Sequence, residues 1–121
     1  MKTILAVDDQ SEVLNMIVEL LIDEGYEVYP ARTTARAFAL LHQMKFDLIL
    51  LDVLMPGMSG IEFLDYSKKQ TWYEKTPVIF VSSETDFKTI AQAINLGAES
   101  YIKKPVEKEV LLAKINAVLS K

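Results

Sequence analysis

The sequence predicts an α/β fold in which a doubly wound, parallel sheet of five strands, in the order 2-1-3-4-5, carries helices on both faces. Two observations lead to this prediction. Short apolar runs alternate with stretches of helical spacing along the chain, as in repeated β-α-β units. The first, third and fourth runs are apolar at every position, which is typical of parallel strands that are covered on both faces.

The composition agrees with one soluble globular domain over residues 1–121. With 121 residues, the chain can form a full core but is too short for two ordinary domains. Its net charge of −4 disfavours binding to nucleic acid. No apolar run approaches the roughly 20 residues that are needed to cross a membrane. Cysteine is absent, which fits the reducing cytoplasm, where we expect the protein to act.

Five apolar runs predict the five strands. They are Ile4–Val7, Glu27–Ala31, Leu48–Leu51, Val78–Val81 and Ser100–Ile102. The second run contains Pro30, which cannot donate a hydrogen bond to a central strand pair and therefore belongs at an edge of the sheet. The fifth run is short and polar and suits the other edge. With right-handed crossovers, these placements give the strand order of flavodoxin-like sheets, whose binding site lies at the carboxyl ends of strands 1 and 3.

Five stretches between and after these runs have the apolar spacing of amphipathic helices. The strongest patterns lie within 13–21, 87–94 and 111–119, and weaker patterns run from 34 to 44 and from 61 to 69. Gly25 and Gly97 follow the first and the fourth of these helices, at the position where a glycine commonly ends a helix. These helices are expected to connect the parallel strands and to cover both faces of the sheet.

Polar residues lie at the ends of four of the predicted strands. They are Asp8 and Asp9 after the first, Asp52 after the third, Ser82 and Ser83 after the fourth, and Lys103 and Lys104 after the fifth. The carboxyl ends of parallel strands meet at one edge of the sheet, so we expect these groups to lie together. Three clustered carboxylates repel one another unless a cation joins them, and an all-oxygen ligand set favours Mg²⁺. A lysine at the same edge indicates an anionic ligand, with phosphate as the first candidate.

Each of these residues also has a purely structural interpretation. Asp9 and Glu12 have the spacing of a capping box for the first helix. Asp52 could open the turn that leads to Pro56, and either serine could cap the loop after the fourth strand. Taken singly, each of these structural interpretations remains open. They do not explain why all the groups fall at the ends of strands 1, 3, 4 and 5, which indicates a site.

The motifs around these residues closely resemble those of the receiver domains of two-component response regulators, over essentially the whole chain. The matching segments are VDD after the first strand, LLDVLMPGMSG after the third, PVIFVSS on the fourth and YIKKP on the fifth. The resemblance implies that Asp52 accepts a phosphoryl group. It also implies that Asp8, Asp9, Asp52 and the backbone carbonyl of Leu54 hold Mg²⁺.

The resemblance implies roles for further residues. Ser82 and Lys104 would bind the phosphoryl group, and Tyr101 would be the aromatic switch residue that turns inward when Ser82 moves. Leu54 and Glu84 would border the approach of the hydrolytic water and would tune the lifetime of the phosphorylated state.

The resemblance also implies a signalling switch, which catalyses only its own phosphorylation and dephosphorylation and is not an ordinary enzyme. A sensor histidine kinase, a phosphotransfer protein or a small phosphodonor would supply the phosphoryl group. The surface of strand 4, helix 4, strand 5 and helix 5 would then control an effector domain or protein, or would mediate a dimer. No direct contact with nucleic acid or membrane is expected.

Three other interpretations remain open. A haloacid-dehalogenase-like phosphatase also uses a strand-end aspartate and Mg²⁺, but it needs a second acid two residues later, where this chain has Leu54. A flavodoxin needs a phosphate-binding loop after the first strand, where Asp8 and Asp9 would repel the phosphate of FMN. A receiver-like interaction module that is never phosphorylated would keep the fold, although the complete set of site residues argues against it.

Overall fold

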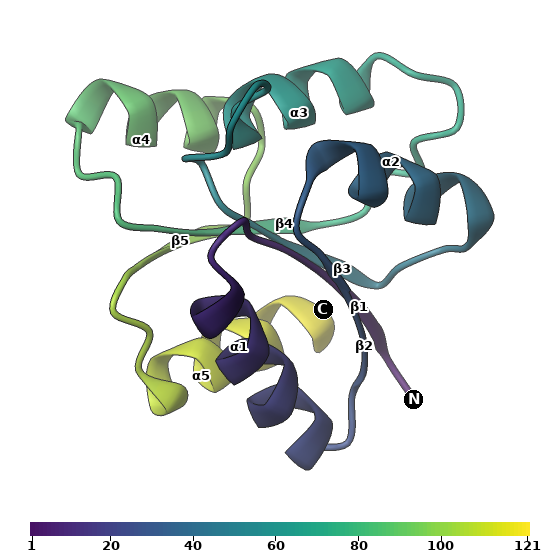
Figure 1. The fold of residues 1–121 in the computed structure, drawn as a ribbon, viewed down its shortest axis with the longest axis vertical. Coiled ribbons are helices and arrows are strands. Elements are labelled where there is room, and N and C mark those ends of the chain that lie inside the picture. The colour runs from purple at the N-terminus through teal and green to yellow at the C-terminus, as the bar shows by residue number, and fades with distance from the viewer.

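The computed structural model describes all residues from 1 to 121 and contains five strands and five helices (Figure 1). The strands are β1 (Thr3–Val7), β2 (Glu27–Ala31), β3 (Leu48–Leu51), β4 (Val78–Ser82) and β5 (Ser100–Lys103). The helices are α1 (Ser11–Asp23), α2 (Thr34–Gln43), α3 (Gly60–Lys68), α4 (Phe87–Asn95) and α5 (Lys108–Leu119). Every strand and helix predicted from the sequence is present. None of the helices has the length and apolarity that a membrane span requires.

All strand pairs in the sheet are parallel, and the strands lie in the order β2-β1-β3-β4-β5. This confirms the predicted doubly wound, flavodoxin-like sheet. Pro30 lies in the edge strand β2, where a missing N–H costs no central hydrogen bond. In the register of β1 and β3, Val7 lies beside Leu51, so the next residues, Asp8 and Asp52, leave the sheet side by side.

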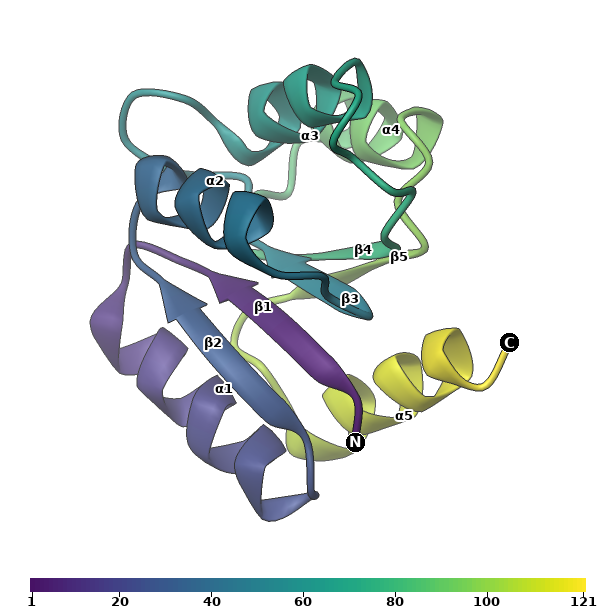
Figure 2. The ribbon, with the colours of Figure 1, turned by 90° about the vertical axis from the view of Figure 1, so that its right-hand side faces the viewer.

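Helices cover both faces of the sheet. In both ribbon views, α1 and α5 lie on one side of the sheet, and α2, α3 and α4 lie on the other (Figures 1 and 2). Successive residues of β1 alternate between two cores. Ile4 belongs to the core with α1 and α5, whereas Leu5 belongs to the core with α2, α3 and α4. Because both faces of the central strands are buried in this way, their sequences are apolar at every position.

The start of α1 differs from one structural interpretation of the sequence. The N-cap of α1 is Gln10, whose side chain makes no capping hydrogen bond. The interpretation of Asp9 and Glu12 as a capping box is therefore wrong, because the helix begins one residue later than that motif requires. A capping box is present at α3, where Ser59 and Glu62 each accept a hydrogen bond from the other residue's backbone N–H.

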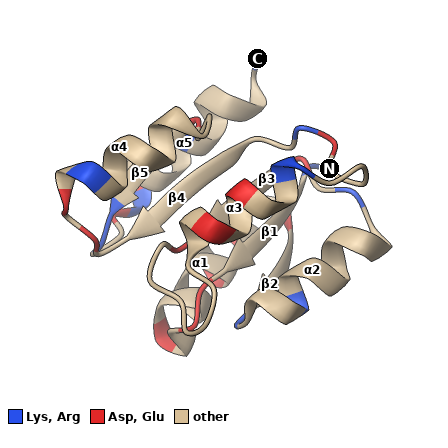
Figure 3. Ribbon diagram, turned by 90° about the horizontal axis from the view of Figure 1, so that it is seen from above, with Lys and Arg blue, Asp and Glu red and all other residues tan.

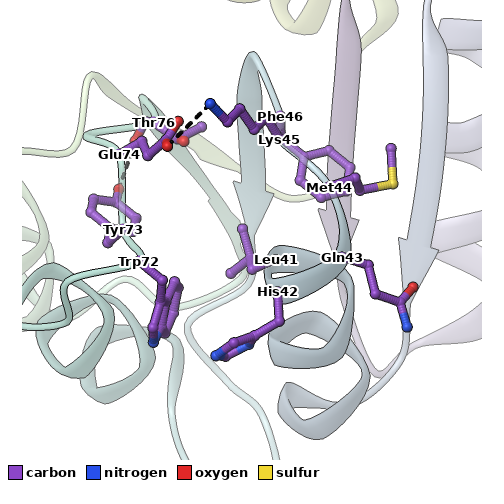
Figure 4. Close-up of a pocket in the computed structure, with 10 residues that line it drawn as sticks. All are labelled: Leu41, His42, Gln43, Met44, Lys45, Phe46, Trp72, Tyr73, Glu74 and Thr76. Atoms are coloured by element: carbon purple, nitrogen blue, oxygen red, sulfur yellow. Dashed lines mark hydrogen bonds and ion pairs between the residues drawn. The ribbon is translucent and has the colours of Figure 1, made fainter.

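A pocket of about 300 Å³ opens between the C-terminal part of α2 and the loop before β4 (Figure 4). The rings of Trp72 and His42 lie with their centroids 4.6 Å apart, and Lys45 forms an exposed ion pair with Glu74. The pocket lies by the amino ends of β3 and β4, at the edge of the sheet opposite the aspartates. It therefore contributes no residue to the site described below.

Candidate functional site

Three carboxylates meet at the carboxyl ends of β1 and β3. One oxygen from each of Asp8, Asp9 and Asp52 lies within 4.8 Å of the others. Asp8 and Asp52 are only 2% and 3% exposed, so two of the acids are almost completely withdrawn from water. Figure 3 shows further acidic residues, in red, on the neighbouring helices α1 and α3. Such a cluster favours the binding of a cation.

The two carboxylate oxygens of Asp8 have different partners. Its Oδ1 accepts a hydrogen bond of 2.9 Å from the backbone N–H of Gln10, whereas its buried Oδ2 lies 2.8 Å from Nζ of Lys104. Burial raises the pKa of the Asp8 carboxyl, and this effect outweighs the opposing effect of nearby Lys104. A buried carboxylate next to two further carboxylates fits the oxygen ligand set of a hard divalent cation such as Mg²⁺.

Asp52 is fixed at the end of β3 by its backbone and by its side chain. Its N–H donates a hydrogen bond of 3.0 Å to the carbonyl of Val7, and its Oδ1 accepts one of 3.2 Å from the N–H of Leu54. The second bond is a local turn contact of the kind that aspartate favours, which agrees with the structural interpretation of Asp52 as a turn residue. The other oxygen, Oδ2, accepts a hydrogen bond of 3.0 Å from Lys104. Hydrogen bonds to both of its side-chain oxygens therefore fix the orientation of the Asp52 carboxylate at the end of β3.

Lys104 contacts two of the three carboxylates. Its Nζ lies 2.8 Å from Oδ2 of Asp8 and 3.0 Å from Oδ2 of Asp52, and the side chain is 9% exposed. It also donates a hydrogen bond of 2.8 Å to Oε1 of Gln10. Burial alone would lower the pKa of Lys104, but its contacts with Asp8 and Asp52 outweigh burial and raise the pKa. The preceding residue, Lys103, is exposed, and the peptide bond that follows Lys104 is cis.

Ser82 and Tyr101 both form hydrogen bonds with the backbone of Glu84. Ser82 is fully buried at the end of β4, and its Oγ accepts a hydrogen bond of 3.2 Å from the backbone N–H of Glu84. The hydroxyl of Tyr101 donates a hydrogen bond of 2.9 Å to the backbone carbonyl of Glu84. Tyr101 is partly buried, and its ring stacks on Phe80 with centroids 6.2 Å apart. A movement of Ser82 would therefore act on Glu84, to which Tyr101 is also bonded.

Two residues of this site were not predicted from the sequence. Gln10 contacts Lys104, and its place directly after the acid pair was the only indication of this contact. Gly60 begins α3 so close to Asp52 that an added Cβ would lie 2.0 Å from the backbone oxygen of Asp52. Its position within the motif after β3 could have identified it, because a close approach of two backbones requires a glycine.

The raised pKa of Asp8 predicts how stability depends on pH without a divalent cation. The folded state holds this proton more tightly than the unfolded chain does. Asp8 therefore favours folding at pH values below its ordinary pKa of 3.8, and this contribution is lost as the pH rises through the raised pKa. Because Asp8→Asn mimics the neutral form, it should raise the free energy of unfolding at pH 7 in EDTA.

Urea unfolding at pH 7 measures this effect. Asp65→Asn is the control, because Asp65 forms an exposed ion pair with Lys69 on α3 and should contribute little. A loss of stability in Asp8→Asn would show that the attraction between Asp8 and Lys104 outweighs the cost of burying the Asp8 carboxylate.

Comparison with known proteins agrees with this geometry. The family model of the response regulator receiver domain matches residues 4–116. The phosphate regulon transcriptional regulatory protein PhoB of Pseudomonas aeruginosa is 38% identical over 118 residues, which cover 98% of this chain and 52% of PhoB. The transcriptional regulatory protein CpxR of Klebsiella pneumoniae is 38% identical over 119 residues, which cover 98% of this chain and 50% of CpxR. The chain belongs to the response regulator receiver domains.

Solved structures show the same fold. The chemotaxis protein CheY4 of Vibrio cholerae superposes with a TM-score of 0.91 at 35% identity, covering 98% of this chain and 99% of that chain. A CheY-like receiver domain protein of Methanospirillum hungatei gives a TM-score of 0.90 at 34% identity, covering 99% and 94%. The chain spans about half the length of the curated relatives named above.

Membership of this family defines the class of function. The chain is a receiver domain of two-component response regulators, which is a signalling switch rather than a classical enzyme. Receiver domains generally bind Mg²⁺ at an acidic pocket and interact with histidine kinases and effector domains. The family match favours this interpretation over a haloacid-dehalogenase-like phosphatase or a flavodoxin.

Proposed function

We propose that Asp52 accepts a phosphoryl group from a histidine kinase, a phosphotransfer protein or a small phosphodonor. The observation that carries this proposal is the position of Asp52. It is a nearly buried carboxylate at the end of a central strand, close to two further carboxylates and hydrogen-bonded to Lys104. The strand holds the carboxylate in one orientation, and the lysine offsets the negative charge that gathers beside it.

In the proposed reaction, an oxygen of Asp52 attacks the phosphorus of the donor. A new oxygen–phosphorus bond forms while the bond from phosphorus to the leaving group breaks, and the leaving imidazole nitrogen of a phosphohistidine keeps the electron pair. The carboxylates of Asp8, Asp9 and Asp52 and the backbone carbonyl of Leu54 would hold Mg²⁺. When bound, this ion supplies positive charge that offsets the acceptor carboxylate and the phosphoryl group together.

Lys104 and Ser82 would then hold two oxygens of the phosphoryl group. When the Ser82 hydroxyl turns toward the phosphoryl group, it gives up the hydrogen bond from the Glu84 N–H. Because Tyr101 is bonded to the carbonyl of Glu84, the change reaches the surface of β4, α4, β5 and α5. Phe87 on α4 is 82% exposed, and such an apolar side chain fits a contact with a partner. This surface is the proposed contact for an effector or for a second receiver domain.

The relatives indicate the kind of output. PhoB and CpxR are transcriptional regulatory proteins, and we propose that this domain controls a comparable effector, either in the same polypeptide or in a separate protein. The net charge of −4 fits a domain that does not itself contact nucleic acid. We expect it to act in the cytoplasm, where it would meet a kinase and an effector of this type.

Intact-mass spectrometry with a small phosphodonor tests the proposed function. In the presence of Mg²⁺, the wild-type protein should gain one phosphoryl group that is stable in acid and labile in base and hydroxylamine. EDTA should prevent this gain, Asp52→Asn should show none, and Asp65→Asn should label like the wild type. Full labelling of Asp52→Asn at the wild-type rate would refute the assignment. No labelling of the wild type would instead favour an unphosphorylated interaction module.

Leu54→Asn is expected to shorten the lifetime of the phosphorylated state. Hydrolysis requires a water in line with the phosphorus, and Leu54, which is 48% exposed two residues after the acceptor, cannot hydrogen-bond such a water. Glu84, the other residue expected to border this approach, turns its carboxylate to the N–H groups of Thr85 and Asp86. An asparagine would orient the water, and we expect a lifetime that is shorter by about threefold or more.

The loss of phosphorylated mass after removal of the donor, at constant Mg²⁺, measures this lifetime. A lifetime equal to or longer than that of the wild type would show that Leu54 does not limit the access of water.

A further inference from the structure

The pocket at the edge of the sheet opposite the aspartates contains no residue of the proposed phosphoryl-transfer site (Figure 4). Its walls come from two segments, which are residues 41–46, at the end of α2 and in the loop that follows, and residues between 72 and 76 in the loop before β4. Its volume of about 300 Å³ lies within the range of sites that hold small ligands. The chemistry of its walls indicates which ligand it can hold.

One end of the pocket is an aromatic wall. The ring centroids of Trp72 and His42 lie 4.6 Å apart. Nδ1 of His42 donates a hydrogen bond of 2.7 Å to the backbone carbonyl of Phe38, which fixes the imidazole ring. The rings of Phe38 and Tyr73 meet the indole of Trp72 edge to face, at centroid distances of 6.1 and 6.4 Å. Because these contacts hold the wall in place without a ligand, binding would have to order few side chains.

The other end of the pocket carries one positive and one negative charge. Nζ of Lys45 lies 3.3 Å from Oε1 of Glu74, and the two side chains are 83% and 56% exposed. Figure 4 shows this ion pair on one side of Leu41 and the rings of Trp72 and His42 on the other. An ion pair that is so exposed adds little stability, so a ligand can separate its two charges at small cost.

We propose that this pocket binds a free α-amino acid with an apolar side chain. The carboxylate of the ligand would pair with Lys45 and its ammonium group with Glu74, while its side chain would lie against Trp72. An α-amino acid carries both charges and its side chain on one carbon atom, which matches an ion pair beside an apolar wall. A ligand with a single charge would leave either Lys45 or Glu74 without a partner. The inference goes beyond the proposed function and does not depend on phosphorylation of Asp52.

The emission of Trp72, the only tryptophan in the chain, reports binding at this pocket. Titration of the wild type with L-leucine should change this emission saturably, with a Kd of about 0.1 to 1 mM, the order expected for a ligand of this size. Glycine has the same two charges without an apolar side chain and should bind about tenfold more weakly or less. Isothermal titration calorimetry should give the same Kd for L-leucine.

Lys45→Met and Glu74→Gln test the two charge contacts one at a time. Each variant should weaken the binding of L-leucine about five- to tenfold. L-Leucinamide lacks the carboxylate, so Lys45→Met should not weaken its binding, and N-acetyl-L-leucine lacks the ammonium group, so Glu74→Gln should not weaken its binding. Lys69→Met and Asp65→Asn are the matched controls, because they remove the charges of an exposed ion pair outside the pocket, and they should bind L-leucine like the wild type.

The absence of saturable L-leucine binding to the wild type would overturn the inference. Equal affinities for L-leucine, its amide and its N-acetyl derivative would overturn it too, because the pocket would then bind apolar groups irrespective of charge. Binding by calorimetry without a change in Trp72 emission would place the ligand elsewhere and would also contradict it. Circular dichroism shows whether the variants are folded, which we expect because Lys45 and Glu74 are exposed. Any of these failures would leave the proposed function intact, since the labelling of Asp52 is measured separately.

Discussion

Gly60→Ala is expected to destabilise the fold by about 3 kcal/mol and to disturb the position of Asp52. A Cβ on Gly60 would lie 2.0 Å from the backbone oxygen and 2.9 Å from the carbonyl carbon of Asp52, and these backbone atoms cannot move aside as a flexible side chain can. The N–H of Gly60 also donates a hydrogen bond of 2.9 Å to the carbonyl of Val53, which ties the start of α3 to the end of β3. The added methyl group must therefore push α3 away from β3 or displace Asp52.

Urea unfolding and phosphorylation by a small phosphodonor measure the two effects of Gly60→Ala. Gly57→Ala is the matched control. At its φ of +78° a side chain costs about 1 kcal/mol, but no atom lies within 4 Å of an added Cβ. We expect Gly60→Ala to lose clearly more stability than Gly57→Ala and to lose most of its phosphorylation. Equal losses of stability would mean that the contact between Gly60 and Asp52 relaxes without strain.

Lys104→Ala is expected to slow phosphorylation of Asp52 by roughly a hundredfold, the order found when one directed donor is removed from a reacting centre. Lys104 is nearly buried, and its Nζ lies 3.0 Å from Oδ2 of Asp52, where negative charge would gather in the proposed transfer. Lys103→Ala should remain close to the wild type, because Lys103 is exposed and successive strand residues point to opposite faces.

The phosphorylated fraction against time, followed by intact mass with the same donor and Mg²⁺ concentration, compares the two lysine variants. If Lys103→Ala proved the slower of the two, Lys103 would be the lysine that acts on the phosphoryl group. The assignment of Lys104 would then be wrong by one residue.

The order of the strands could be predicted because a few residues decide it. Pro30 excluded β2 from the centre of the sheet, and the polarity of Ser100 and Lys103 placed β5 at the other edge. The run from Leu48 to Leu51 is apolar at every position, which requires cover on both faces. Because strands and helices alternate, parallel strands must be connected by crossovers, which are right-handed. In the resulting sheet the first and third strands are neighbours, so Asp8 lies beside Asp52.

The contacts among the site residues could not be predicted in the same way. Asp9 and Glu12 match a capping box locally, but the helix begins one residue later, with Gln10 at the N-cap position and without a side-chain capping hydrogen bond. The hydrogen bond between Gln10 and Lys104 joins residues 94 positions apart. Its formation depends on how the ends of β1 and β5 approach each other across β3 and β4, which apolar periodicity does not specify.

The claim that Asp52 is the phosphoryl acceptor is tested most directly by chemical trapping of the acyl phosphate. The wild-type protein is incubated with Mg²⁺ and a small phosphodonor, reduced with borohydride, digested and sequenced by tandem mass spectrometry. Borohydride converts the acyl phosphate of an aspartate into the alcohol of homoserine, so the phosphorylated residue carries a permanent mark. We predict homoserine at position 52 and not at Asp8 or Asp9, and none when the donor is omitted. Homoserine at Asp8 or Asp9, or at no residue, would contradict the assignment of Asp52.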